Sequence, residues 1–147
     1  MMAQMTAQGL AEAVADAMYA RDPAVRAFGI RIQQVGPGYA LLTMPVRDDM
    51  LNGHGSCHGG LIFTLADSAF AYACNSRNQN TVASGCTIDF LLPGLPGDVL
   101  SAEAVEQSLA GRTGVYDITV SNQDGKKVAL FRGRSASIKG GVLEGSQ

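Results

Sequence analysis

The sequence is poor in charged residues and contains no tryptophan, only two histidines and three cysteines. Its formal net charge of −2 argues against a nucleic-acid-binding surface, because such surfaces are strongly basic. The three cysteines, Cys57, Cys74 and Cys86, are widely spaced and cannot all form disulfides within one chain. We therefore expect free thiols and a cytoplasmic location.

Long uninterrupted apolar runs are also missing. A membrane-spanning helix needs ~20 consecutive apolar residues, and Asp67 interrupts the one candidate stretch. The first 22 residues lack a basic start followed by an apolar core, so we expect no signal peptide. The 147 residues suit one domain, with a core large enough to fold without disulfides or metal.

The residues that are present follow regular helix and strand patterns. Apolar residues at helical spacing predict an N-terminal helix over residues 8–20, which Pro23 ends. A second helix, over residues 61–76, is apolar on almost every side, so we expect it to be buried. Short β-type runs bounded by turn signals predict strands over residues 30–35, 39–46, 81–92, 97–109, 113–122 and 126–138.

Short connections between consecutive strands indicate an antiparallel sheet, and a helix that is apolar all round must be covered on most sides. The sequence therefore predicts an α+β fold in which a curved antiparallel sheet wraps around one long central helix. We expect an N-terminal helical segment over residues 1–24, a single domain over residues 25–139 and a flexible tail over residues 140–147.

One charged side chain, Asp67, lies in the middle of the predicted buried helix. The residues three and four positions away include no cation: Phe63, Thr64, Phe70 and Ala71. Because an unpaired carboxylate is costly to bury, we expect burial to raise the pKa of Asp67 unless hydrogen bonds to the ionised form offset the effect. Perturbed carboxylates concentrate at functional sites, and the alternative is an ion pair with a distant arginine.

The sequence His58-Gly59-Gly60 stands where this helix begins. The first four N–H groups of a helix have no partner within it and lie at the positive end of its dipole. Glycines at this point leave the backbone open to a ligand oxygen, so the helix start could stabilise an oxyanion or polarise a carbonyl group. The simpler alternative is that the glycines only permit a tight turn.

The spacing of these two features constrains how they act together. Gly59 and Asp67 lie about 12 Å apart along a helix that rises ~1.5 Å per residue. A base or nucleophile and an oxyanion donor must each lie about 3 Å from the reacting group, so one helix cannot easily supply both. Two antiparallel helices related by a two-fold axis could, with Gly59 from one subunit and Asp67 from the other. We therefore predict an obligate homodimer.

Five segments carry a family pattern: MLNGHGSCHGGLIFTLADSAFAYACNS, VASGCTIDFLLPG, GDVLSAEA, RTGVYDI and VALFRGRS. They resemble the hotdog-fold acyl-CoA thioesterases, in the branch that acts in phenylacetic acid degradation, and the resemblance runs from about Phe28 to about Ile138. It implies the hotdog fold, dimers that form through their sheets and often pair again into a dimer of dimers, and no cofactor. It also implies hydrolysis of phenylacetyl-CoA or ring-hydroxylated phenylacetyl-CoA.

The resemblance further assigns roles to residues. It makes Asp67 the catalytic carboxylate, the Gly59 amide the group that polarises the thioester carbonyl, and Asn52 the residue that orients substrate or water. It places a hydroxyl on the strand after the helix, for which Ser84 is the first choice and Thr87 the second. Asp67 would deprotonate water or attack the carbonyl to form an anhydride, and the sequence does not separate these routes.

Other polar residues near the helix start have simpler explanations. His54, Cys57 and His58 lack the spacing and the further ligands of a zinc site, so we expect no metal. Cys57 and His58 are adjacent and do not face each other as a nucleophile and its base would. We expect both to pack or to line the substrate, and His58 and Gly60 are candidate substrate-binding residues.

Three arginines are candidates for the phosphates of coenzyme A, because guanidinium groups pair well with phosphate. Arg132 and Arg134 share one face of a predicted strand, and Arg112 lies in the turn before residues 113–122. The alternative for each is a solvated strand face. An aryl pocket would be lined by one or two of Met50, Leu51, Phe63 and Phe90.

Two other functions remain open from the sequence. A hotdog-fold enoyl-thioester hydratase or dehydratase usually needs a histidine with an acid as its partner, and the predicted helix supplies an acid but no histidine. A non-catalytic acyl-CoA-binding protein would need an effector module, for which 147 residues leave no room. The expected partners are a coenzyme A thioester and further copies of the chain, with no nucleic acid and no membrane.

Overall fold

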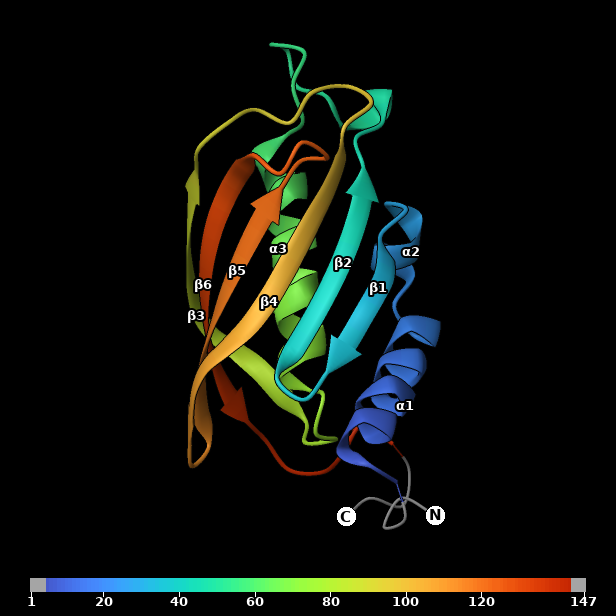
Figure 1. Cartoon of the computed structure of the whole chain (residues 1–147), viewed down its shortest axis with the longest axis vertical. Helices are drawn as coiled ribbons and strands as arrows, with labels where there is room; N and C mark the ends of the chain where they lie inside the picture. The colour runs from blue at the N-terminus through green and yellow to red at the C-terminus, as the bar shows by residue number, and fades with distance from the viewer. Residues whose placement is uncertain (1–4, 144–147) are drawn as a thin grey trace.

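The described residues form an antiparallel sheet that curls around one long helix, as Figure 1 shows for the computed structural model. The structure describes residues 5–143. The strands follow the order β1 (Arg31–Gly36), β2 (Tyr39–Pro45), β4 (Val99–Ala110), β5 (Thr113–Ser121), β6 (Lys127–Ser137) and β3 (Thr81–Phe90). The central helix α3 (Gly59–Cys74) lies against one face of this sheet, so the predicted α+β fold is confirmed.

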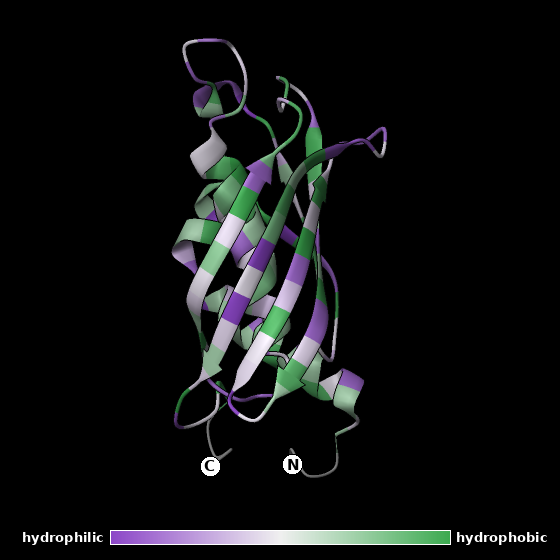
Figure 2. Ribbon diagram, turned by 90° about the vertical axis from the view of Figure 1, so that its left-hand side faces the viewer, coloured by the Kyte–Doolittle hydropathy of each residue, from purple (hydrophilic) through white to green (hydrophobic). Residues whose placement is uncertain are grey.

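All six predicted strands and both predicted helices are present in the described part of the chain, each within two residues of its expected ends. The strands alternate buried and less buried residues, as in β5, where Tyr116, Ile118 and Val120 face α3. Figure 2 shows this alternation as changing hydropathy along the strands. The strand order was not predicted. Strand β3 does not pair with β4, which follows it in the sequence, but with β6 at one edge of the sheet.

The N-terminal part of the fold covers the opposite edge of the sheet. Helix α1 (Ala7–Ala20) lies along β1, and the Tyr19 hydroxyl donates a hydrogen bond of 2.8 Å to the Ile30 carbonyl. Pro23 follows the end of α1 as expected, but it also opens a short helix, α2 (Pro23–Ala27), which was not predicted from the sequence. Proline is favoured there because the first helical position needs no N–H donor.

Part of the predicted tail contacts the body of the domain. The backbone N–H of Asn80 donates a 2.9 Å hydrogen bond to the Gly140 carbonyl, and the Arg21 guanidinium donates one of 3.2 Å to the Val142 carbonyl. Residues 144–147 of that tail and residues 1–4 of the N-terminal segment lie outside the described residues.

One side of α3 is less covered than the rest. The residues that face the sheet are fully buried, as the apolar pattern predicts. Along the opposite side runs an open stripe of residues at helical spacing that are exposed or only half-buried: Gly60, Phe63, Thr64, Asp67, Ala71 and Cys74. The single domain therefore leaves its central helix incompletely covered, with Asp67 in the middle of the gap.

Aromatic side chains join α3 to the sheet. The rings of Phe63 and Phe131 lie 5.3 Å apart between centroids, Phe70 and Phe131 6.0 Å, and Phe70 and Tyr116 5.6 Å. Gly133 makes room for this row, because a Cβ at that position would meet the Phe70 ring at 2.8 Å. Phe70 is held one helical turn after Asp67, so this contact also fixes the backbone that carries the carboxylate.

Gly133→Ala is expected to lower the free energy of unfolding by about 1–3 kcal/mol, because the new methyl group overpacks the core against Phe70. Gly53→Ala is the matched control, since a Cβ there meets no atom within 4 Å, and it should change stability by less than about 1 kcal/mol. Denaturant unfolding of the three proteins measures both. Equal effects from the two substitutions would contradict the packing argument.

Candidate active site

Backbone hydrogen bonds fix the point at which α3 begins. In the preceding loop, Cys57 N–H donates to the Gly94 carbonyl and His58 N–H to the Met50 carbonyl, each at 2.8 Å. The N-cap residue His58 has extended dihedrals, φ −56° and ψ 134°, and its side chain makes no capping bond. Among the described residues, the N–H of Gly59 has no hydrogen-bond partner, so it is available to an oxygen of a ligand.

A groove of about 280 Å³ opens at this helix start. Its walls are mostly apolar, with the helix N-terminus at one side: Cys57, Gly59, Ile62, Phe90, Leu91, Leu92 and Pro93. The Phe90 ring lies so close that a Cβ on Gly59 would meet it at 3.1 Å. The residue Phe90 is 52% exposed, as expected for a residue that faces an open groove. The groove combines an apolar wall with the unpaired N–H at the positive end of α3.

Asp67 is half-buried on the open stripe of α3 and forms no hydrogen bond or ion pair with any described residue. Burial raises the pKa of Asp67, as expected from its apolar neighbours in the sequence. The alternative of a structural ion pair with a distant arginine finds no partner among residues 5–143. A carboxylate without a partner, in surroundings that favour its neutral form, is suited to accept a proton.

Asn52 shapes the loop before the helix. Its amide oxygen accepts hydrogen bonds from the backbone N–H of His54 at 2.9 Å and of Ser56 at 3.2 Å. Gly55 lies at the tip of this loop with φ +77°, a conformation that favours glycine. These hydrogen bonds from the loop backbone to the Asn52 side chain were not predicted, although Asn followed by glycine is a turn signal. The role of Asn52 in orienting substrate or water stays a prediction.

The other predicted site residues fall into two groups. His58 and Gly60 are exposed at the helix start, and Phe63 is half-buried beside Asp67 on the open stripe. Ser84 lies exposed in a bulge of β3, where its hydroxyl donates a 3.2 Å hydrogen bond to a β6 carbonyl. Thr87 is exposed on the face of the sheet away from α3. His58, Gly60 and Phe63 thus lie at or on the same helix as Asp67, whereas Ser84 and Thr87 lie on β3.

The three candidate arginines also differ in their surroundings. Arg132 forms a two-pronged ion pair with Asp117, at 2.6 and 2.8 Å, on the outer face of the sheet. Arg112 donates a long 3.4 Å bond to the Ser137 carbonyl. The Arg134 guanidinium makes no hydrogen bond with described residues and lies across β3, where a Cβ on Gly85 would meet it at 2.7 Å. Of the three, Arg134 has the most available hydrogen-bond donors.

Within residues 5–143, no three histidine, cysteine, aspartate or glutamate side chains are grouped closely enough to hold a metal ion. No helix in the same part of the chain is long and apolar enough to span a membrane.

Comparison with known proteins agrees with this geometry. Residues 54–129 match the Thioesterase superfamily, and the match includes all of α3 and the groove at its start. The acyl-coenzyme A thioesterase PaaI of Escherichia coli K12 is 55% identical over 131 residues, which cover 89% of this chain and 93% of that protein. The chain belongs to the hotdog thioesterase superfamily. Within that superfamily it is an acyl-CoA thioesterase of the PaaI type.

Solved structures support the same assignment. The E. coli PaaI protein from the phenylacetic acid degradation operon superposes with a TM-score of 0.91 at 52% identity, covering 92% of this chain and 99% of that one. The PaaI protein of Thermus thermophilus, solved as a mutant, gives 0.77 at 41% identity, covering 80% and 100%. A Streptococcus mutans UA159 protein solved with bound acetyl-CoA gives 0.73 at 29% identity, covering 76% and 90%. The predicted fold and enzyme class are thus confirmed.

Asp67→Asn is expected to make the protein more stable than the wild type at neutral pH. Because burial raises the pKa of Asp67, the unfolded chain loses this proton first as the pH rises, and ionisation then penalises the folded state. The stability of the wild type should therefore fall relative to Asp67→Asn as the pH rises through the raised pKa. Denaturant unfolding of both proteins across acidic to neutral pH measures the difference. A difference in stability between the two proteins that stays constant with pH would contradict the raised pKa of Asp67.

Proposed function

We propose that the protein hydrolyses aryl-acetyl thioesters of coenzyme A, with phenylacetyl-CoA or ring-hydroxylated phenylacetyl-CoA as substrate, to the free acid and coenzyme A. The observation that carries the proposal is the presence on α3 of two groups that have no hydrogen-bond or ion-pair partner within residues 5–143, the Gly59 N–H and the Asp67 carboxylate. The similarity to a PaaI protein of the phenylacetic acid degradation operon supports the choice of acyl group. The free cysteines support a cytoplasmic location.

The two groups have complementary tasks in this reaction. As water or a carboxylate oxygen attacks the thioester carbonyl carbon, negative charge develops on the carbonyl oxygen. The Gly59 N–H stabilises that charge, an effect of roughly 2.7–4 kcal/mol for one such donor in other enzymes. Asp67 either takes the proton from the attacking water or attacks directly to form an anhydride that water then opens. In both routes the C–S bond breaks, and the coenzyme A thiolate leaves and takes up a proton.

A second copy of the chain completes the site in this proposal. The outer edge of β3 has no strand partner among the described residues, whereas α1 lies along the β1 edge. An unpaired edge strand of ten residues is a ready surface for pairing with another strand. Antiparallel pairing of two β3 edges extends the sheet and sets the two α3 helices side by side. The open stripe of one helix then faces the other, with Asp67 opposite the partner's helix start.

Coenzyme A needs a further contact for its phosphates. We assign this contact to Arg134, because its guanidinium makes no hydrogen bond with the described residues and lies over Gly85 of β3, the strand at which the second copy pairs. Arg132 is a weaker candidate, since its nitrogens already bind the Asp117 carboxylate. The same pairing of strands leaves the outer face of the sheet open for a dimer of dimers.

Asp67→Asn is expected to lower kcat on phenylacetyl-CoA by roughly 10²–10⁴-fold, the usual contribution of a general base. Asparagine keeps the size of the side chain and removes its basicity. A free-thiol assay of released coenzyme A measures the rate, and calorimetry with a non-hydrolysable analogue checks that ligand binding is retained. Turnover near the wild-type rate would remove Asp67 from the mechanism.

Gly59→Pro is expected to lower kcat by roughly 10²–10³-fold, because proline removes the N–H that stabilises the oxyanion. The fold should tolerate this change, since Gly59 is the first helical residue and His58 already has the extended dihedrals that a residue before proline requires. Gly59→Ala is the matched control, because it adds a Cβ against the exposed Phe90 ring and keeps the N–H. Equal losses in both variants would show that space, and not the N–H group, matters.

Mixed dimers test whether two subunits share each site. Chains that carry Asp67→Asn are unfolded and refolded together with chains that carry Gly59→Pro in equal amounts. Half of the random dimers are then mixed, and each mixed dimer has one intact site, so activity should return to about a quarter of the wild-type value. Dimers whose mixing is verified by mass and which stay inactive would show that each subunit works alone.

A further inference from the structure

Asp98 is an almost fully buried carboxylate, only 8% exposed, that forms no ion pair within residues 5–143. It lies at the end of the loop of residues 91–98, between β3 and β4. Its Oδ2 accepts a 2.9 Å hydrogen bond from the Leu95 N–H, and its Oδ1 accepts one of 2.9 Å from the Gln123 side chain. These bonds offset the cost of burying the charge, and they tie the loop to the turn between β5 and β6.

Gln123 connects Asp98 to the start of β4. Its Nε2 donates to Asp98, and its Oε1 accepts a 3.0 Å hydrogen bond from the Val99 N–H. From the Leu95 N–H through the two side chains to the Val99 N–H, each donor thus faces an acceptor. The Asp98 carbonyl also accepts a 2.8 Å hydrogen bond from the Val46 N–H. Side-chain and backbone bonds therefore fix this end of the loop together.

The loop that Asp98 fixes also carries the carbonyl group that holds the residues before α3. The Gly94 carbonyl accepts the 2.8 Å hydrogen bond from the Cys57 N–H. The two residues lie so close that a Cβ on Gly94 would meet the Cys57 Cβ at 3.0 Å. Cys57 precedes the N-cap residue His58, which the next peptide bond joins to Gly59. A displacement of Gly94 therefore reaches the N–H that polarises the thioester carbonyl in the proposed reaction.

The apolar wall of the groove has an attachment of its own. The N–H groups of Leu91 and Leu92 both donate to the Val128 carbonyl, at 2.8 and 3.3 Å. These bonds lie at the opposite end of the loop from Asp98. A change at Asp98 should therefore displace Gly94 and the helix start more than it displaces the groove wall.

We propose that Asp98 and Gln123 are positioning residues for the oxyanion donor. They hold the Gly94 carbonyl, and through it the Cys57 backbone, so that the Gly59 N–H is aimed at the developing charge. Neither residue lines the groove, so both act through the loop. The inference rests on the proposed function, because it concerns the N–H that the proposed reaction uses. A misplacement of about 1 Å that arises from a distant substitution can cost roughly 10²-fold in rate.

Asp98→Asn tests the proposal, because it puts a new donor into a chain of paired groups. In every orientation of the new amide and of the Gln123 amide, one donor then faces another donor. We expect kcat on phenylacetyl-CoA to fall by roughly 10–10²-fold with KM unchanged, since the oxyanion forms only in the transition state. The free-thiol assay measures both constants at a temperature at which denaturant unfolding shows each variant to be folded.

An exchange of donor and acceptor between the two side chains supplies the rescue. Gln123→Glu alone should fold, because Gln123 is exposed in its turn, and should lower kcat, because two carboxylates then face each other. The double variant Asp98→Asn with Gln123→Glu pairs every donor with an acceptor again, in reversed roles. Its kcat should return close to the wild-type value.

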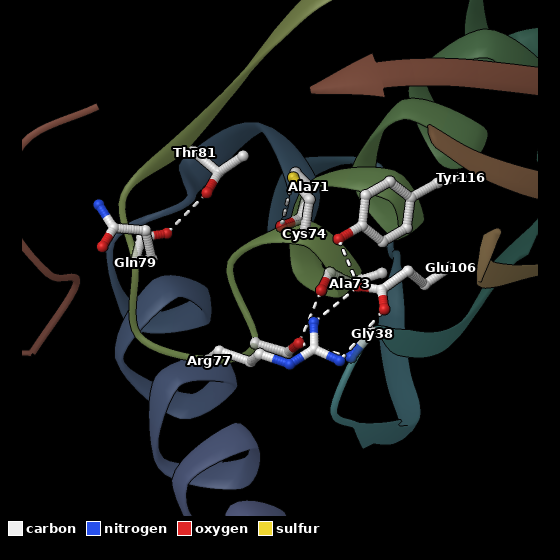
Figure 3. A network of polar contacts seen from close by, with 10 residues as sticks. Gly38, Ala71, Ala73, Cys74, Arg77, Gln79, Thr81, Glu106 and Tyr116 are labelled. Atoms are coloured by element: carbon white, nitrogen blue, oxygen red, sulfur yellow. Dashed lines mark hydrogen bonds and ion pairs between the residues drawn. The ribbon is translucent and has the colours of Figure 1, made fainter. Parts of the chain in front are cut away.

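A similar network at the other end of α3 provides the matched control. There the Arg77 guanidinium binds the Glu106 carboxylate at 2.6 and 3.2 Å, and the Tyr116 hydroxyl donates to it at 2.9 Å. Figure 3 shows these side chains converging beside Cys74, the last residue of α3. That residue lies about 22 Å along the helix axis from Gly59. Tyr116→Phe likewise breaks one bond of a carboxylate network, and it should leave kcat unchanged.

The same substitution in a Gly59→Pro background shows whether the effect depends on the N–H. Because that variant has no N–H to position, Asp98→Asn should lower its kcat little further. In an Asp67→Asn background, which keeps the N–H, Asp98→Asn should lower kcat by the same factor as in the wild type. A general loosening of the structure would instead lower kcat equally in both backgrounds.

The outcomes separate this inference from the proposed function. A loss of kcat that the double variant reverses and that disappears in the Gly59→Pro background supports both. Single variants with unchanged kcat, a rise in KM alone, an equal loss in Tyr116→Phe or an equal loss in both backgrounds overturns the positioning role and leaves the proposed function standing. A wild-type enzyme that hydrolyses no aryl-acetyl thioester of coenzyme A overturns the proposed function and the inference with it.

Discussion

The fixed rise of an α-helix is the constraint on which the rest of this structure depends. It places the Gly59 N–H and the Asp67 carboxylate, neither of which has a partner among the described residues, about 12 Å apart. That distance is too long for both to act on one small reacting group. Within residues 5–143, one stripe of α3 is also left open and one edge of the sheet has no strand partner. These three features have a common explanation if a second copy of the chain supplies the missing half of each site.

The sequence alone predicts much of the fold, because local patterns determine its elements. Helical spacing defines α3, alternation defines the strands, and glycine-rich turns separate them. The order of the strands could not be derived in the same way, since the pairing of β3 with β6 depends on contacts between distant parts of the chain. The open stripe on α3 was also not predicted, because the sequence of an apolar helix has the same pattern whether its own domain or a partner covers it.

The candidate site shows the same division. The surroundings of Asp67 and the position of Gly59 at the helix start could be predicted, because a charge in an apolar helix and glycines before it are visible in the sequence. The groove wall formed by Leu91, Leu92 and Pro93 could not, since these residues meet the helix start only through the fold. Asn52 lies between these cases: its position near the helix start was visible, but the hydrogen bonds that close its loop required the structure.

Both ends of α3 are anchored. At its start, two backbone hydrogen bonds of 2.8 Å join the loop to Met50 and Gly94. Just beyond its end, the Ser76 hydroxyl accepts a 2.8 Å bond from the Gly38 amide, and the Asn75 amide oxygen accepts one of 2.9 Å from the Thr81 amide. Because α3 is anchored at both ends, it cannot shift along its axis to accommodate a longer or shorter acyl chain. Relatives with other acyl preferences should therefore differ in the side chains that line their cavities, while the length and position of this helix stay the same.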